Sequence, residues 1–298
     1  MKKRLSGILF GLVFLTGLAI FLYPTISEQW NKYHQSKAIA GYEDIVAEMA
    51  EEDFNTVWAE AASYNDTITV NTFGGDAFSK QEKSLKSTAY WSVLNLEDNG
   101  IMGYLSIPKI NQKLPIYHGT SDSVLQIGVG HISGTKLPIG GEGTHSVLAA
   151  HRGLPSARLF TDIDQLKKGD KFYIHILNEV LAYEIDQILP MIDKNDMESL
   201  TKALQNEEGQ DYVTLFTCTP YGVNSHRLLV RGHRTEYHGE DDENLTVEEA
   251  MLQSVKDYYM FYALLAVASS ILIAICIRMV KNRTLLKRRR EGKNEKDK

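Results

Sequence analysis

Residues 211–237 read DYVTLFTCTPYGVNSHRLLVRGHRTEY, and this stretch decides how the rest of the chain is interpreted. Residues 212–217 are rich in β-branched and aromatic side chains and predict a strand, which a Pro-Tyr-Gly turn then ends. A second strand is predicted over residues 227–234. Cys218 is therefore expected where the first strand gives way to a loop. Arg227 is expected at the start of the neighbouring strand, close enough to share one site.

Cys218 is expected to be a free thiol. The other cysteine, Cys276, lies inside an apolar run near the C-terminus and is not a predicted partner. Because the thiolate is the nucleophile, a cysteine enzyme needs a base or a positive neighbour. Histidine is the usual base. Among the nine histidines of the chain, His151 follows an apolar strand predicted over residues 146–150, whereas His145 precedes the same strand at its other end.

Arginine side chains are candidates for stabilising negative charge on a reacting carbonyl oxygen. Arginine stays charged and offers several rigid hydrogen-bond donors. Arg227, Arg231 and Arg234 all lie on the second predicted strand. Each of them could instead pair with an acidic residue as an ordinary strand arginine.

The motif around Cys218 carries a resemblance. Residues 214–218, Thr-Leu-Phe-Thr-Cys, resemble the TLxTC signature of the sortase family. The next sixteen residues, 219–234, are similar to the class C, or pilin-polymerising, branch of that family. The segment Leu-Ala-Ala-His-Arg-Gly at 148–153 is similar to the one in which sortases place their catalytic histidine. The resemblance extends over most of the chain after about Asp76.

The resemblance assigns roles to three residues. It implies that Cys218 is the nucleophile, His151 the catalytic histidine and Arg227 the donor to the substrate carbonyl oxygen. Arg231 is then expected to be structural. Papain-like proteases run cysteine before histidine and contain disulfides, so the order seen here does not fit them.

Outside this motif the chain predicts a mainly β fold. Short strands that recur with little helix between them indicate a closed β-barrel or a sandwich, and the resemblance selects the barrel. The predicted strands are 103–110, 113–117, 146–150, 171–176 and 180–189, and the predicted short helices are 121–127 and 197–204.

A helical segment and a loop are expected before the barrel. Apolar residues recur at spacings of three and four between residues 27 and 64, which predicts one or two amphipathic helices. The loop at residues 65–80 contains Asp76-Ala77-Phe78. This triplet resembles the Asp-Pro-aromatic lid of class C sortases, with Ala77 in place of proline, and implies that Asp76 and Phe78 cover the active site. A loop that merely docks on the surface is the alternative.

Both ends of the chain suggest a membrane protein. Residues 5–23 and 258–277 carry no charge and are long enough to span a bilayer. Basic residues precede the first run and follow the second, which predicts both termini in the cytoplasm and the body outside the plasma membrane. The first run could be an uncleaved anchor or a cleavable signal peptide.

These patterns divide the chain into six parts. They are an N-terminal membrane anchor or signal (1–24), a helical segment with the lid loop (25–80), a catalytic β-barrel (81–240), a linker (241–257), a C-terminal transmembrane helix (258–278) and a basic cytoplasmic tail (279–298).

Several functions are not supported by the sequence. The formal net charge is −6; residues 2–4 contribute +3 and residues 278–298 contribute +7, so residues 5–277 carry a net charge of −16. An acidic body does not resemble a nucleic-acid-binding protein. No CxxC or HExxH motif suggests a metal site, and no phosphate-binding lysine motif is present. We therefore expect no cofactor.

The expected function is that of a membrane-held cysteine transpeptidase. By resemblance, its substrates are pilins or surface proteins with an LPxTG-like sorting signal, and the acceptor amine is a pilin lysine, so that pili are polymerised. Membrane lipid is a further expected partner. The alternatives are a housekeeping sortase that uses an amine of the cell-wall precursor, and a non-catalytic interaction module of the pilus or wall.

Overall fold

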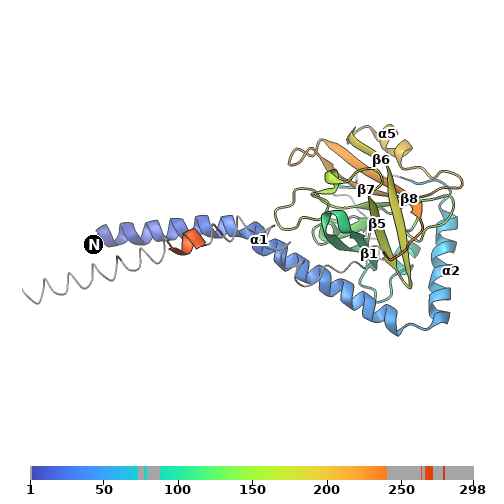
Figure 1. The fold of residues 1–298 in the computed structure, drawn as a ribbon, viewed down its shortest axis with the longest axis horizontal. Helices are drawn as coiled ribbons and strands as arrows, with labels where there is room; N and C mark the ends of the chain where they lie inside the picture. The colour runs from blue at the N-terminus through green and yellow to red at the C-terminus, as the bar shows by residue number, and fades with distance from the viewer. Residues whose placement is uncertain are drawn as a thin grey trace, which may run out of the picture. The chain divides into compact units, whose positions relative to one another are not determined.

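The computed structural model describes residues 2–72, 77–78, 88–239, 263, 266–270 and 278, and it describes only the backbone of residues 2–10 and 12. Residues 1–241 form one compact unit and residues 242–298 a second. The first unit contains every strand of the described chain and is drawn in Figure 1.

Eight strands form a closed barrel in the order β1-β2-β3-β4-β7-β8-β6-β5, which confirms the predicted closed β-barrel. The strands are β1 (Ile101–Ile107), β2 (Gln112–His118), β3 (Val129–His131), β4 (Thr144–Ala149), β5 (Lys171–Ile176), β6 (Glu179–Asp193), β7 (Asp211–Thr219) and β8 (His226–Thr235). Neighbouring strands are antiparallel except for β2 with β3 and β4 with β7. The parallel pair β4–β7 brings two carboxyl ends to one edge of the barrel.

One predicted strand end was wrong and one strand was missed, both for local reasons. The strand predicted over 103–110 ends at Ile107, because proline at position 108 begins a 3₁₀ turn, η1 (Pro108–Ile110). Strand β3 was not predicted, because three residues are too few to show a pattern. It contains Gly130, where a Cβ atom would lie 2.2 Å from the carbonyl oxygen of Gly119, so the close approach of these two backbones requires glycine.

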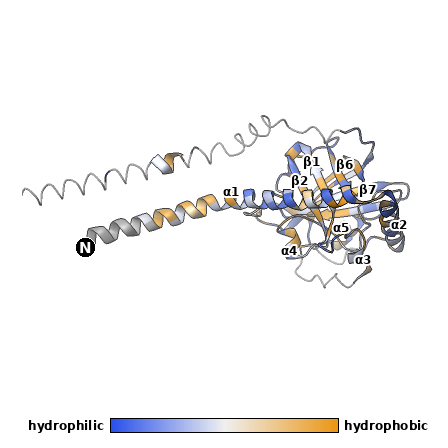
Figure 2. Ribbon diagram, turned by 90° about the horizontal axis from the view of Figure 1, so that it is seen from below, coloured by the Kyte–Doolittle hydropathy of each residue, from blue (hydrophilic) through white to orange (hydrophobic). Residues whose placement is uncertain are grey.

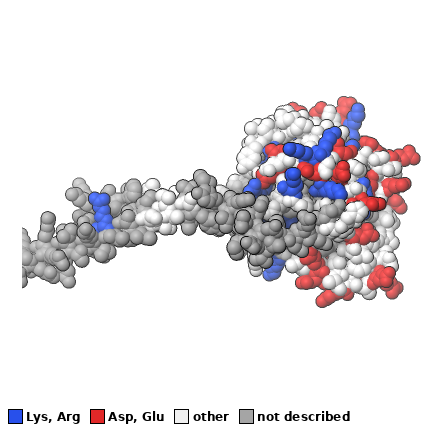
Figure 3. All heavy atoms as spheres, in the orientation of Figure 1, with Lys and Arg blue, Asp and Glu red and all other residues white. Residues whose placement is uncertain are grey.

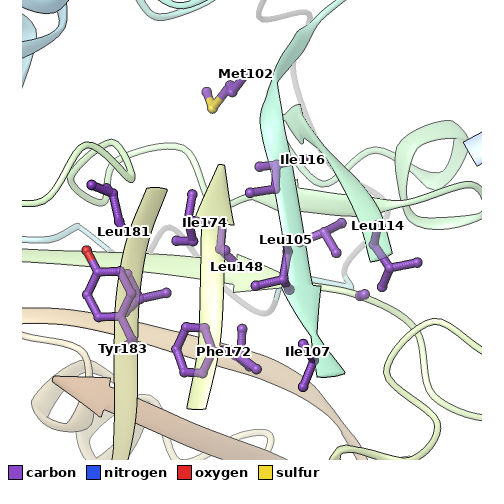
Figure 4. Close-up of a cluster of buried hydrophobic side chains, with 14 of the residues drawn as sticks. Met102, Leu105, Ile107, Leu114, Ile116, Leu148, Phe172, Ile174, Leu181 and Tyr183 are labelled. Carbon is purple, nitrogen blue, oxygen red and sulfur yellow. The ribbon is translucent and has the colours of Figure 1, made fainter. Parts of the chain in front are cut away.

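The barrel interior is filled by apolar side chains. Figure 4 shows this cluster between strands β1, β2, β4, β5 and β6. The labelled residues are Met102, Leu105, Ile107, Leu114, Ile116, Leu148, Phe172, Ile174, Leu181 and Tyr183. All ten are almost fully buried, so the interior is a packed core rather than a channel.

The helices pack around the barrel. They are α1 (Lys2–Glu48), α2 (Glu51–Thr67), α3 (Ala89–Ser92), α4 (Asp122–Leu125) and α5 (Met197–Ala203), with a second 3₁₀ turn, η2 (Ile163–Gln165). The segment at 27–64, predicted to form one or two amphipathic helices, corresponds to the second half of α1 and to most of α2. Ile39 and Tyr42 of α1 pack against Ile101 and Tyr104 of β1, so this half of α1 is part of the folded unit.

Helix α1 also contacts the loop that follows β4. The Nδ2 of Asn31 donates a hydrogen bond to the carbonyl oxygen of Ser156 (2.7 Å), and the buried carboxylate of Glu28 accepts one from the backbone N–H of Arg158 (2.6 Å). The loop at 151–162 is therefore supported by a helix that is distant in sequence.

In Figure 2 the described residues in the first half of α1 are mostly hydrophobic, and the half beside the barrel is largely hydrophilic. Among the described residues, no helix combines the length and the apolar character that crossing a membrane requires. The span predicted at 5–23 lies partly outside the residues with described side chains. The span predicted at 258–278 lies almost entirely outside the described residues, as do the linker and the basic tail.

Two fully buried histidines should make the fold sensitive to acid. In His131, Nε2 donates to the carbonyl oxygen of Lys136 and Nδ1 accepts from the hydroxyl of Tyr90, both at 2.8 Å. His145 lies between the carbonyl oxygen of Gln205 and the hydroxyl of Thr214. Both sites hold a neutral imidazole, and burial lowers the pKa of His131 to about 3 and that of His145 to about 4.

We expect the free energy of unfolding to fall as the pH drops below about 6.5, the unfolded pKa of histidine. Between the unfolded pKa of about 6.5 and the lower pKa in the folded state, the unfolded chain binds more protons than the folded chain. In this range each histidine should lower the free energy of unfolding by about 1.4 kcal/mol per pH unit. Urea unfolding of the full chain in a neutral detergent at pH 7.5, 6 and 5 measures this. His145→Gln should flatten the dependence, and His238→Gln, at a side chain 64% exposed, should not. Equal stability at all three pH values would contradict the prediction.

Candidate active site

Cys218 and Arg227 face each other across one pair of antiparallel strands. Cys218 is the register partner of Arg227 in the ladder between β7 and β8. The sequence-based expectation put the cysteine at the start of a loop, but β7 continues to Thr219, so the thiol is held by the strand itself. The ladder continues because β8 begins at His226 and supplies hydrogen-bond partners for the end of β7. Cys218 is buried, with 5% of its surface exposed.

His151 lies beside Cys218 on the other neighbour of β7. Strands β4 and β7 are parallel, and Ala149 pairs with Phe216. The pairing extends beyond β4, because the N–H of Ala150 donates to the carbonyl oxygen of Phe216 at 3.2 Å. His151 and Cys218 lie two residues beyond the pair formed by Ala149 and Phe216, so they are neighbours where the two segments continue. The alternative histidine, His145, is at the far end of β4 and has no access to this site.

The three candidate residues lie on the outer face of the barrel wall. Side chains alternate between the faces of a strand, so residues two apart share a face. Ala149, Phe216 and Leu229 belong to an apolar cluster that is separate from the barrel interior. His151 and Cys218 each follow a member of this cluster by two positions, and Arg227 precedes one by two positions. The site therefore continues the outer cluster.

Hydrogen bonds to backbone carbonyl groups orient the guanidinium of Arg227. Its Nη1 donates to the carbonyl oxygens of His226 (2.8 Å) and Asn224 (3.1 Å), and 2% of the residue is exposed. A guanidinium fixed from one side can present its other N–H groups to a substrate oxygen.

The competing arginines have structural contacts. Arg231 pairs with Asp186 (2.6 Å) and Glu207 (3.5 Å) and stacks on the ring of Tyr212. Its guanidinium is therefore occupied in binding β6 to β8, in agreement with the structural role expected for it. Arg234 lies over the ring of Tyr183, whose hydroxyl bonds to Asp211 at the beginning of β7. That is the end of β7 opposite Cys218.

Phe78 covers the site. Its ring stacks on His151 at 5.3 Å and on Phe216 at 5.9 Å, measured between ring centroids. The guanidinium carbon of Arg227 lies 5.3 Å from the same ring. Ala77 is buried next to it, and Asp76 lies outside the described residues. The aromatic residue of the predicted lid thus contacts two of the three candidate residues.

The protonation of His151 is set by two opposed effects. Burial lowers the pKa of its imidazole, and the negative charge of Asp122 in α4 raises it to a smaller extent. The net pKa is below the ordinary value, so at neutral pH the ring is mostly neutral and can accept a proton. Sequence reasoning did not identify Asp122 as part of the site, because nothing in the chain order places it near His151.

No metal site is apparent in the described part of the chain. Within residues 2–72, 77–78, 88–239 and the short described pieces beyond, no group of three or more histidine, cysteine, aspartate or glutamate side chains could hold a metal ion. On the face of the barrel seen in Figure 3, basic and acidic side chains are interspersed. This face is not the continuous basic surface that binding to a nucleic-acid backbone requires.

The fold and this site together have the parts of a cysteine acyl-transfer enzyme. They supply a nucleophile, a base and a fixed donor for an oxyanion on three adjoining strand ends of a closed barrel.

Comparisons with known proteins agree with this class. Residues 105–235 match the model of the sortase domain. Sortase D of Bacillus subtilis is 33% identical over 135 residues, which are 44% of this chain and 63% of the relative. Sortase A of Bacillus anthracis is 28% identical over 46% of this chain and 61% of its own length. The chain thus matches less than two thirds of the length of these curated relatives.

Solved structures match over a longer region. Sortase C1 from Streptococcus agalactiae is 47% identical, with a TM-score of 0.61 over 68% of this chain and 100% of that chain. Sortase C-1 from Actinomyces oris is 41% identical, with a TM-score of 0.55 over 61% of this chain and 99% of that chain. The chain belongs to the sortase family, and these structural neighbours are class C sortases.

We expect Phe78→Ala to raise the rate at which a small alkylating reagent modifies Cys218. An aromatic contact contributes about 0.5–1.5 kcal/mol, so the rate should rise about 2- to 10-fold. Ala77→Pro should lower it, because proline reduces the freedom of the open loop. Peptide mass mapping gives the rate at Cys218 separately from Cys276.

Trp30→Ala is the control for this prediction, because it truncates an aromatic side chain that is 65% exposed on α1. Its Cys218 should react at the wild-type rate. Identical rates in all the variants would show that Phe78 does not limit access to the thiol.

Proposed function

We propose that this chain is a membrane-held transpeptidase that cleaves an LPxTG-like sorting signal between threonine and glycine and transfers the acyl group to an amine. The observation that carries the proposal is the placement of Cys218, His151 and Arg227 on three adjoining strand ends under the ring of Phe78. A non-catalytic interaction module would not need a base and a fixed guanidinium beside a buried thiol.

In the first half-reaction the sulfur of Cys218 attacks the carbonyl carbon of the threonine–glycine bond. His151 accepts the thiol proton as the carbon–sulfur bond forms. Negative charge then develops on the carbonyl oxygen, and N–H groups of Arg227 stabilise it. When the carbon–nitrogen bond breaks, His151 returns the proton to the leaving glycine amine and a thioester remains on Cys218.

In the second half-reaction an acceptor amine attacks the thioester. His151 takes a proton from the amine, the carbon–sulfur bond breaks, and the proton returns to Cys218. Phe78 must move for the sorting signal to reach the thiol. The ring is held by stacking on His151 and Phe216, by the guanidinium of Arg227 and by packing on the outer apolar cluster, and each such contact is weak enough for opening.

The acceptor that we propose is the amine of a pilin lysine. Two solved relatives support this choice: one is described as a pilus-related sortase C of Group B Streptococcus and is 42% identical over 97% of that chain. The other is described as sortase C1 of a pilus island of the same organism and is 40% identical. An aromatic residue over the site also favours the class with a lid. A cell-wall precursor amine is the alternative acceptor.

We also propose that the barrel lies outside the plasma membrane with both termini in the cytoplasm. The support is the sequence alone, namely two uncharged runs at 5–23 and 258–277 that are flanked by basic residues. Protease treatment of intact cells, followed by detection of epitope tags at the two termini, tests this topology.

The activity is tested by incubating the full chain in detergent with a quenched fluorescent peptide that contains LPxTG. Cleavage and an adduct on Cys218, seen by intact-protein mass spectrometry, are expected. Adding a pilin subunit or a short glycine peptide then identifies the acceptor from the mass of the product. A protein that forms no adduct and cleaves no LPxTG peptide, with any of these acceptors, would refute the proposal.

A further inference from the structure

The residue after His151 connects the two strand ends of the site. The guanidinium of Arg152 donates to three different partners: Nη1 to the hydroxyl oxygen of Thr219 (3.2 Å), Nε to the carbonyl oxygen of Thr161 (3.2 Å) and Nη2 to Asp164. Thr219 directly follows Cys218. The contact therefore joins the residue after the candidate base to the residue after the candidate nucleophile.

A second contact joins the residues that precede His151 and Cys218. The hydroxyl of Thr217 donates to the carbonyl oxygen of Ala150 at 2.6 Å. His151 and Cys218 are thus bracketed by two cross-strand hydrogen bonds, one from residue 217 to residue 150 and one from Arg152 to residue 219. The backbone ladder between β4 and β7 ends before this point, so side chains continue it.

The loop that carries Arg152 folds back onto the site. The N–H of Phe160 donates to the carbonyl oxygen of His151 at 3.1 Å, and the N–H of Gly153 donates to the hydroxyl of Thr161 at 3.2 Å. The side chain of Arg152 is 10% exposed, whereas that of Asp164 is 47% exposed. An ion pair with a partner so open to solvent contributes little to global stability.

We infer that Arg152 is a positioning residue that holds His151 beside Cys218 through its hydrogen bond to Thr219. The inference rests on the proposed function, in which the imidazole and the thiol exchange a proton. Proton transfer requires a hydrogen-bond distance, and a displacement of about 1 Å can lower a rate about 100-fold. The planar fork is required because three acceptors in different directions are bound at once, which a lysine ammonium on a flexible chain does not reproduce.

The test compares Arg152→Ala, Thr219→Val and the double variant with wild type in steady-state cleavage of an LPxTG peptide. Arg152→Ala should lower kcat about 10- to 100-fold and leave KM nearly unchanged, because the residue acts on the catalytic pair rather than on the peptide. Thr219→Val keeps the shape of the side chain and removes the hydroxyl, which accepts from Arg152 and also donates to the sulfur of Met191 at 4.0 Å, so it should lower kcat by a smaller factor. The double variant should be no slower than Arg152→Ala, since the two residues act through one contact.

Arg158→Ala is the matched control. Arg158 is on the same loop and pairs with Asp162 at 2.6 Å, but its described contacts do not reach β7. Its kcat should stay within about twofold of wild type. Thermal unfolding of each variant shows whether the fold is kept, and if Arg152→Ala does not fold, Thr219→Val still tests the contact.

Three outcomes would overturn the inference. The first is a kcat of Arg152→Ala near that of wild type. The second is a double variant whose loss of kcat equals the product of the two single losses. The third is a loss of kcat in Arg158→Ala as large as that in Arg152→Ala. In each of these cases wild type remains active, so the proposed function stands. A wild-type protein that neither cleaves the peptide nor forms the Cys218 adduct would overturn the proposed function and this inference together.

Discussion

Cys218→Ala is expected to abolish peptide cleavage and adduct formation while the fold is kept. The reaction proposed here passes through a covalent bond to the sulfur, and no second described cysteine lies near the site. Loss of a nucleophile in a comparable site lowers kcat by about 10⁶-fold. A buried thiol behaves as a small apolar group, so alanine should be tolerated at this position.

Steady-state cleavage and intact-protein mass spectrometry measure the effect of Cys218→Ala, and thermal unfolding confirms that the barrel is intact. Cys276→Ser is the matched control and should retain wild-type turnover. If Cys218→Ala turned over the peptide at a rate near that of wild type, the sulfur would have no part in the mechanism.

Arg227→Lys is expected to lower kcat about 100- to 1000-fold even though the charge is retained. Removing one oxyanion donor has an effect of this size in other acyl-transfer enzymes. Nη1 of Arg227 donates to the carbonyl oxygens of residues 224 and 226, and we propose that other N–H groups of the same guanidinium serve the substrate oxygen. The lysine ammonium is a point charge on a flexible chain. It cannot donate to the two backbone carbonyl oxygens and to the substrate oxygen with the planar geometry of a guanidinium.

Arg231→Lys is the control for this second prediction. It makes the same change four residues further along β8, where the guanidinium pairs with Asp186 and stacks on Tyr212. We expect it to reduce thermal stability slightly and to leave kcat within a few-fold of wild type. Should Arg227→Lys retain the kinetics of wild type while Arg231→Lys is slow, the oxyanion donor would be Arg231 instead.

The sequence by itself determined most of the strands, and its resemblance to the sortases selected the barrel and named the candidate residues. Alternating apolar residues and turn residues are local signals, so β5, β7 and β8 were predicted nearly at their observed positions, whereas β6 continues to Asp193, beyond its predicted end at residue 189. The motif from residue 214 to residue 234 named Cys218 and Arg227, and the segment around residue 151 named the histidine. Strand β3 and the early end of β1 were missed because a three-residue strand and a single turn carry too little periodicity.

The tertiary structure decided how these residues meet. Only the parallel register of β4 with β7 shows that residues 151 and 218 are neighbours, because sequence spacing carries no information about which strands pair. The same holds for the contacts of Phe78 and Arg152 and for the charge effect of Asp122 on His151, which join residues 9 to 149 positions apart in the sequence. Hydrogen bonds, stacking and charge act over a few ångströms of space, and folding alone brings these side chains within that range.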